Sequence, residues 1–171
     1  MTRQYQLLSF LFFLLLIAGC TNENVEDILA EANPPVDPGD ASIWDGERIT
    51  FTQENGSDPN DEANQDRITD NVWLTRDNDG GPIFNIRVES TNNNFGPTGT
   101  LWAIGSIDDV ENLSFEPLRT ALGGQRTSFQ SAPNADMVLF LTEDSVFIPI
   151  RFLSWSSGKQ GGFSYERATE R

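Results

Sequence analysis

Residues 137–155, MVLFLTEDSVFIPIRFLSW, contain two apolar runs rich in aromatic and β-branched side chains, and only 143–145 separate them. Runs of this kind are typical of β-strands, and three polar residues are enough for a hairpin turn. The sequence therefore predicts that 137–142 and 146–155 form an antiparallel hairpin. The second run contains Pro149, which cannot donate a ladder hydrogen bond and so predicts a sheet edge or a bulge.

Five further runs have the pattern of strands, with clusters of Gly, Asn, Asp or Pro between them. Alternation of apolar and polar side chains is clearest at 48–53 and 83–88, and Trp102 lies within another short run. Short strands at this spacing favour an antiparallel all-β fold. We therefore expect a two-sheet sandwich, jelly-roll-like, in which the hairpin is joined by strands at 48–53, 72–76, 83–88, 101–104 and 162–167.

One short helix is expected between the strands. Ser114 is placed to cap it, and Pro117 fits its first turn because no backbone donor is needed there. Residues 118–122 supply the helix, and Gly123 and Gly124 end it, since glycine adopts the left-handed conformation that closes many helices. This helix is predicted to plug an end or cover an edge of the sandwich.

The N-terminus has the pattern of a secretory signal peptide. Arg3 is followed by an apolar run at 7–17 and then by two small residues. The run is too short for a membrane span, which needs about 20 apolar residues. Residues 17–20 (Ile-Ala-Gly-Cys) end in the only cysteine of the chain and resemble a bacterial lipobox.

The resemblance to a lipobox implies that 1–19 are removed and that Cys20 receives a diacylglycerol thioether and an N-acyl chain. Two acyl chains anchor a protein stably, because each buried methylene adds about 0.8 kcal/mol. The lipid bilayer is therefore the expected partner of Cys20, and the bacterial cell envelope is the expected location. Thr21, in place of aspartate, is similar to an outer-membrane sorting signal. The acids at 23–27 are similar to surface-export signals but also to a solvated linker, so surface exposure stays open.

The chain divides into three parts. Residues 20–42 are polar, acidic and rich in proline, as expected of a flexible, extended tether behind the lipidated cysteine. Residues 43–171 are enough for one domain with its own core. We therefore expect a signal peptide at 1–19, a tether at 20–42 and a β-sandwich domain at 43–171.

Charge and composition exclude several classes of function. Arg3 is the only charged residue in 1–19, so the mature chain keeps 10 basic and 26 acidic residues. Such a surface repels nucleic acid, which binds proteins through its phosphates. Histidine is absent and lipidation of Cys20 leaves no free thiol, which excludes the usual catalytic triads and zinc sites.

Two blocks have a more specific pattern, NQDRITDNVWLTR at 64–76 and FLSWSSGKQGGFSYER at 152–167. Together they resemble an uncharacterised family of small secreted bacterial β-domains, and the likeness spans most of 43–171. The resemblance implies a compact secreted domain, and it implies no activity, cofactor or binding residue.

Two acidic loops have features of calcium sites. Residues 77–81 (DNDGG) combine carboxylates with glycines, but an EF-hand register would place Ile86 at the bidentate glutamate, so a hairpin turn is the preferred interpretation. A second loop contains Asp58, Asp61 and Asp66, the preferred ligands of a structural calcium ion. The alternative, that these carboxylates are simply solvated, is favoured, and no cofactor is expected.

Tryptophan and arginine supply the remaining candidates. Trp73 and Trp102 lie among Val, Leu and Ile and are predicted to be core. Trp155 lies among Ser and Gly, which makes it a candidate for stacking on a sugar ring, with partial burial in the core as the preferred alternative. Buried or half-buried ion pairs with Asp66 or Glu166 are expected for four arginines: Arg67, Arg76, Arg151 and Arg167.

No catalytic motif is recognisable. A glycosidase needs two carboxylates held across a cleft, and in so acidic a domain some pair will meet that distance by accident. We therefore expect a non-catalytic binding or structural module anchored to the envelope, with extracellular glycan or an envelope protein as candidate partner. The alternative left open is a carbohydrate-active enzyme or a glycan-binding accessory domain at the cell surface.

Overall fold

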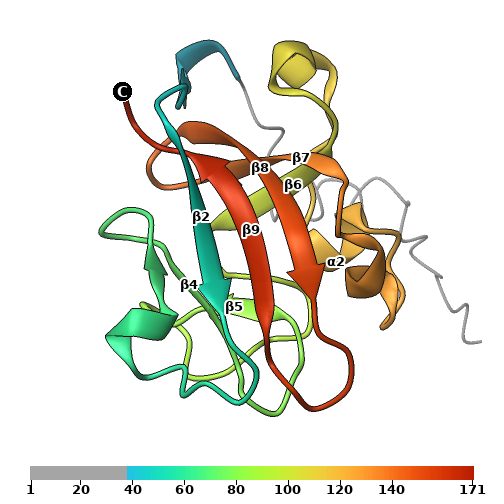
Figure 1. Cartoon of the computed structure of the whole chain (residues 1–171). Coiled ribbons are helices and arrows are strands. Elements are labelled where there is room, and N and C mark those ends of the chain that lie inside the picture. The colour runs from blue at the N-terminus through green and yellow to red at the C-terminus, as the bar shows by residue number, and fades with distance from the viewer. Residues whose placement is uncertain (1–37) are drawn as a thin grey trace, which may run out of the picture. The chain divides into compact units, whose positions relative to one another are not determined.

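The computed structural model describes residues 38–171 and contains a large and a small β-sheet (Figure 1). The strands pair antiparallel, except that β1 (Ser42–Ile43) lies parallel to the start of β8 (Val146–Trp155). The large sheet has the order β2-β9-β8-β7-β6, with β2 at Arg48–Gln53, β9 at Phe163–Ala168, β7 at Asp136–Leu141 and β6 at Thr100–Ile104. The small sheet has the order β3-β4-β5, with β3 at Asp66–Arg67, β4 at Trp73–Arg76 and β5 at Ile83–Asn85.

One apolar core lies between the two sheets. Leu74 and Ile83 of the small sheet are fully buried in the same cluster as Trp102, Leu139 and Tyr165 of the large sheet. Burial of large apolar side chains from both sheets is the main stabilising contribution to such a fold. The predicted all-β, two-sheet sandwich is therefore confirmed.

Gln53 joins the sheets by hydrogen bonds at the end of β2. Its Oε1 accepts from the backbone N–H of Arg76 and from Oγ1 of Thr75, both at 3.0 Å, and its Nε2 donates to the carbonyl of Arg76 at 2.6 Å. In Figure 1 the small sheet accordingly lies near the end of β2 and the start of β9. These bonds fix the position of Arg76 relative to the large sheet.

The strand order of the large sheet is a meander. Strands β6 to β9 are neighbours in the order in which they follow along the chain, and β2 pairs with the outer side of β9. A jelly roll interleaves its strands between two sheets, so the jelly-roll order expected from the sequence is not found. All seven predicted strands form, β2 and β8 with the predicted bounds. The two-residue strands β1 and β3 were not predicted.

Strand β5 ends at Asn85, three residues earlier than predicted, because the buried amide of Asn85 binds neighbouring backbone. Its Oδ1 accepts from the N–H of Trp73 at 2.9 Å, and its Nδ2 donates to the carbonyls of Asn71 at 2.9 Å and Thr98 at 3.0 Å. A side chain that bonds the backbone in this way competes with continuation of the ladder.

Strand β8 is an interior strand, so the edge position predicted from Pro149 is wrong. On one side β8 pairs with β7; on the other it pairs with β1 at its first two residues and with β9 from Ile150. The carbonyl of Phe147 accepts from the N–H of Trp44, directly after β1. The backbone polar groups of alternate residues point to the same neighbouring strand. Pro149 therefore faces the gap between β1 and β9, where no donor is required. The bulge of β8 lies between Phe152 and Ser154 instead.

Within residues 38–171 the one α-helix is α2 (Leu118–Ala121), as predicted. Gly123 (φ 102°) and Gly124 (φ 80°) follow it in the left-handed conformation. Its N-cap is Pro117 without a side-chain cap, so the predicted cap at Ser114 is wrong. No helix in this part of the chain is both long and apolar enough to cross a bilayer. The described residues also contain four 3-10 segments: η1 (Pro38–Asp40), η2 (Glu62–Asn64), η3 (Ile107–Asn112) and η4 (Ser128–Ser131).

Regular structure begins ahead of residue 43, the predicted start of the domain. The N–H of Ser42 donates to the carbonyl of Ser145 at 2.9 Å, and Ala41 packs against the small apolar cluster formed by Val138, Phe140 and Phe147. The predicted signal peptide, Cys20 and most of the predicted tether lie outside the described residues.

Candidate functional site

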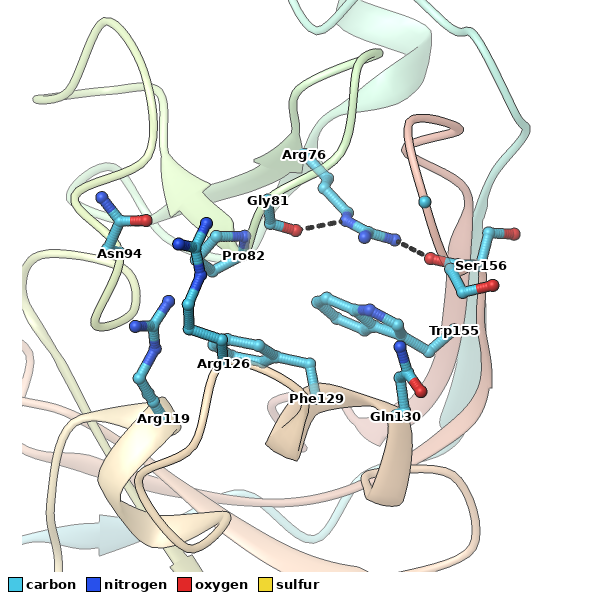
Figure 2. Close-up of a pocket in the computed structure, with 12 residues that line it drawn as sticks. Arg76, Gly81, Pro82, Asn94, Arg119, Arg126, Phe129, Gln130, Trp155 and Ser156 are labelled. Carbon is cyan, nitrogen blue, oxygen red and sulfur yellow. Dashed lines mark hydrogen bonds between the residues drawn. The ribbon is translucent and has the colours of Figure 1, made fainter.

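A surface pocket of about 180 Å³ lies beside the end of β8 (Figure 2). Its lining comes from segments far apart in the chain: the β4–β5 hairpin, the loop around Asn94, the segment from α2 to η4, and the end of β8. We refer to it as the arginine pocket, and its lining residues are Arg76, Gly81, Pro82, Asn94, Arg119, Arg126, Phe129, Gln130, Trp155, Ser156, Ser157 and Gly158.

Arg76, the last residue of β4, is held at the pocket by backbone carbonyls. Its Nε donates to Gly81 at 2.7 Å, and its Nη1 donates to Gly162 at 2.8 Å and to Ser156 at 3.1 Å. The residue is only 3% exposed, and no carboxylate of the described chain lies within ion-pair distance of it. The predicted ion pair of Arg76 is therefore wrong, because carbonyl oxygens take the place of an acid.

Trp155 is held between two groups of the protein. The Arg76 guanidinium carbon lies 4.0 Å from the centroid of the indole, and Phe129 stacks on the indole with a centroid distance of 5.2 Å and an interplanar angle of 14°. Figure 2 shows Arg76 above the indole and Phe129 below it. Trp155 is partly buried against the core and lines the pocket. A sugar ring could therefore not stack on Trp155 without displacing Arg76 or Phe129.

Arg119 and Arg126 line the other side of the pocket. Neither forms an ion pair or a side-chain hydrogen bond with the part of the chain that is described, and Nε of Arg119 is buried without a hydrogen-bond partner. The guanidinium of Arg119 lies 5.5 Å from the ring centroid of Phe129. Figure 2 shows both guanidinium groups directed toward the side on which Asn94 lies.

The pocket is positively charged in an acidic protein. No acidic side chain lines it, whereas the whole chain has a net charge of −15. Burial lowers the pKa of Arg76 to about 10, which leaves this group protonated at neutral pH. Clustered cations in a concave, partly desolvated site attract anions, and guanidinium groups bind carboxylates and phosphates with paired hydrogen bonds.

Close contact of two glycine loops forms one wall of the pocket. Gly80 (φ 103°) lies against the carbonyl of Gly158, and Gly161 (φ 72°) lies against the carbonyl of Asp77, so a Cβ at either position would overlap backbone. The DNDGG segment is thus the turn between β4 and β5, which was the preferred interpretation. Its contact with the loop after β8 helps to place Arg76 against Trp155.

The three predicted calcium ligands lie in separate hydrogen-bond networks. Asp58 accepts from the N–H of Asn60 at 2.9 Å, a bond that lowers the pKa of Asp58. Asp61 caps η2 by accepting from the N–H of Ala63 at 3.1 Å, and Asp66 is buried in an ion pair. Among residues 38–171, no three metal-ligating side chains gather into a group that could hold an ion. The structure therefore does not bring the predicted ligands together.

Asp66 forms a buried, bidentate ion pair with Arg167, as predicted. Its Oδ2 accepts from Nε and its Oδ1 from Nη2, each at 2.7 Å, and the side chains are 7% and 5% exposed. Tyr165 donates to Oδ2 of Asp66 at 2.6 Å. Burial raises the pKa of Tyr165 well above its usual value, and the charge of Asp66 adds to this effect. Other ion pairs are more exposed: Arg67–Glu62, Arg151–Asp136 and Arg48–Glu166.

The other tryptophans divide between core and surface. Trp102 is fully buried, as predicted. Trp73 is not core: it is half-buried, and its Nε1 donates to the carbonyl of Thr69. The guanidinium carbons of Arg67 and Arg87 lie 4.3 Å and 5.4 Å from its ring centroid. The apolar neighbours of Trp73 in sequence alternate to the other face of the strand, which is why composition alone misplaced it.

Arg119, Arg126 and Phe129 were missed as site residues. A signal was present, because the stretches 117–135 and 145–165 contain no acidic residue in a chain that has 26 of them. These two stretches supply most of the pocket lining. Local absence of acid in an acidic protein would therefore have pointed to this site.

No family model, no curated protein and no solved structure matches the chain.

Proposed function

We propose that this chain is a lipid-anchored, non-catalytic binding module of the bacterial cell envelope, and that the arginine pocket is its ligand site. One observation carries the proposal: three arginines face a cavity and no carboxylate lines it. Neutral hydrogen-bonding side chains, among them Asn94, Gln130 and Ser157, complete the lining. Concave sites with aromatic walls and a few convergent polar groups are the usual form of a ligand pocket.

The chemistry of the lining supports binding over hydrolysis. Glycoside hydrolysis uses a pair of carboxylates on either side of the scissile bond, and none of the lining residues is acidic. The arginines also lack the proton-transfer capacity of a general acid or base at neutral pH, because a guanidinium stays protonated. The groups at this pocket can hold an anion or a polar ligand and orient it.

The N-terminal sequence supports the envelope location. Acyl chains on Cys20 would hold the protein at the bilayer, and a proline-rich tether would let the domain reach ligands away from the surface. The sorting signal at Thr21 favours the outer membrane. Extracellular glycan is the candidate partner that suits a small polar pocket better than an envelope protein, whose interface would need a larger surface.

A blocking variant tests the site without assuming a charge for the ligand. Ser157 is exposed at the pocket, so Ser157→Phe places a ring in its mouth; Ser90→Phe, at an exposed serine outside the lining, is the matched control. The full-length protein, purified in detergent micelles, is passed over immobilised envelope and extracellular glycans. We expect wild type and Ser90→Phe to be retained, Ser157→Phe to pass through, and the glycan to be recovered intact.

Two results would contradict the proposal. Equal retention of Ser157→Phe and wild type would place the binding site elsewhere on the domain. Recovery of cleaved glycan would replace the non-catalytic module with the carbohydrate-active alternative.

A further inference from the structure

We propose that the ligand of the arginine pocket is an acidic sugar unit, a hexuronic acid, whose carboxylate is bound by Arg119 and Arg126. This inference rests on the proposed function and adds the chemical class of the ligand to it. Its starting point is a cation at the pocket that lacks an acidic partner in the described chain. Nε of this residue, Arg119, is also the one buried side-chain nitrogen or oxygen without a hydrogen-bond partner in residues 38–171.

An unpartnered buried donor is costly, about 1–3 kcal/mol and more for a charged group. Arg126 shares the pocket with Arg119 and also lacks an acidic partner in the described part of the chain. Two like charges at one cavity repel each other. An anion between them would supply the missing counter-charge and remove the repulsion, and a planar carboxylate matches the fork of N–H groups on a guanidinium.

Arg76 has a different task. Three backbone carbonyls already accept from its Nε and Nη1, and its face lies on Trp155. It therefore adds positive potential to the pocket from a fixed position, while the direct contacts to a ligand fall to Arg119 and Arg126. Because Arg76 also holds two loops together, its removal would disturb the fold and is not a clean test.

The neutral groups of the lining indicate a hydroxylated ligand. Asn94, Gln130, Ser156 and Ser157 offer donors and acceptors of the kind that bind sugar hydroxyls. A nucleobase or another flat aromatic ligand is disfavoured, because Trp155 has Arg76 and Phe129 on its faces and Phe129 has Trp155 and Arg119 near its ring. A cavity of about 180 Å³ suits one sugar ring at the end of a glycan.

The experiment compares acidic sugars with their neutral counterparts on full-length protein in detergent micelles, by ligand-observed NMR titration. The probes are galacturonate, glucuronate and mannuronate, each paired with the hexose of the same configuration. Inorganic sulfate and phosphate form separate arms, because they share the anionic chemistry without the sugar. Arg126→Gln removes an exposed pocket cation, and Arg87→Gln removes an exposed arginine outside the lining with the same change of charge.

We expect at least one uronate to bind about tenfold or more tightly than its hexose, as a charged hydrogen bond implies. We expect Arg126→Gln to weaken that binding by a similar factor and Arg87→Gln to leave it nearly unchanged. Raising the salt to about 0.3 M should weaken uronate binding, because screening reduces charge attraction.

Other outcomes overturn the inference in distinguishable ways. If hexoses bind as tightly as uronates, and Ser157→Phe abolishes this binding while Arg126→Gln does not, the ligand is not an acidic sugar. The proposed function would still stand in that case. If sulfate or phosphate alone binds as tightly as any uronate, the pocket recognises an anion and not a sugar, and the inference is wrong. If no probe binds and no immobilised glycan retains the protein, both the inference and the proposed function are wrong.

Discussion

At the scale of single residues, two arginines show different ways of accommodating a buried guanidinium. Arg167 is neutralised by Asp66, with Tyr165 as a second donor to the carboxylate. Arg76 has no acid and relies on three carbonyls and the face of Trp155. The carboxylate of Asp66 neutralises Arg167 within the protein, whereas Arg76 keeps its positive charge at the arginine pocket.

The Asp66–Arg167 pair gives a first prediction. Asp66→Asn should cost about 3–5 kcal/mol of unfolding free energy, because it leaves a buried guanidinium without its counter-charge. Urea unfolding followed by circular dichroism measures the change. Glu62→Gln, which breaks the exposed pair with Arg67, is the control and should cost less than about 1 kcal/mol. Equal losses of unfolding free energy in the two variants would show that Asp66 does not neutralise a buried Arg167.

Tyr165 gives a prediction on pH. Its pKa is raised in the folded protein, chiefly by burial and then by Asp66, so above pH 10 the unfolded chain loses a phenolic proton that the folded chain keeps. Ionisation then favours unfolding. The stability of wild type relative to Tyr165→Phe should be constant from pH 7 to 9 and fall above about pH 10, by up to about 1.4 kcal/mol per unit. Urea unfolding across this range measures the difference, and a constant difference would contradict the prediction.

Trp155 gives a prediction on packing. Trp155→Ala removes the stack with Phe129 and an edge contact with Phe152, and because the indole is only partly buried we expect a loss of about 2–4 kcal/mol. Trp102→Ala, at a fully buried position, should reach about 3–5 kcal/mol or more, the range for a large core aromatic. Thermal and urea unfolding compare the two. A Trp155→Ala variant as stable as wild type would mean that the indole contributes nothing to the core.

At the scale of elements, β8 is an interior strand because two different strands cover one of its edges. It pairs with β1 at its start and with β9 from Ile150, and Pro149 occupies the gap in between. The proline therefore marks a junction within an interior strand, and β1, although only two residues long, completes the side of β8 that β9 does not reach.

Truncation tests the contribution of β1. A chain that begins at Trp44 lacks β1, the hydrogen bond from Ser42 to Ser145 and the packing of Ala41. It should lose about 1–3 kcal/mol relative to a chain that begins at Pro38, from the lost pairing with β8 and the exposed apolar surface. Chains that begin at Thr21 and at Pro38 should melt alike, because the proline and acid content of 21–37 leaves little apolar surface to bury. A lower melting temperature on removal of 21–37 would mean that the tether packs on the domain.

At the scale of the whole molecule, the proposed function needs both an anchor and a ligand site. Cys20 would hold the protein at the bilayer, and the arginine pocket would bind the ligand. The chain has 26 acids and a net charge of −15, so it repels polyanions in general, and the acid-free lining of the arginine pocket is the exception.

Substitution of the cysteine tests the anchor. Cys20→Ser should move the protein from the detergent-extracted membrane fraction into a soluble or uncleaved form, since no thioether can form. Mass spectrometry of the wild-type protein should show an acylated N-terminus at Cys20. A mature chain that starts at an unmodified residue other than Cys20 would disprove lipidation.

Local patterns were sufficient for much of the fold. Alternation at 48–53 and the apolar runs around 143–145 predicted β2, β7 and β8, and Gly123–Gly124 predicted the end of α2. These features follow from rules that act over a few residues: side chains alternate along a strand, and glycine tolerates left-handed backbone. The all-β class and the β7–β8 hairpin could therefore be predicted from the sequence, whereas the meander order of the large sheet could not.

Long-range packing decided the rest. Whether Arg76 meets an acid and whether Pro149 lies at an edge depend on segments distant in sequence, the loop at Gly162 and strand β9. Whether Trp73 is core depends on which face of β4 meets the large sheet, and that face carries Leu74. The arginine pocket has the same origin, because Arg119 and Trp155 meet only when α2, η4 and the end of β8 converge. Local sequence was thus sufficient for most strands, for the helix and for the charge of the chain, because these depend on neighbouring residues. Which buried charges are neutralised depended on the fold, because Asp66 meets Arg167 whereas Arg76 meets only carbonyls.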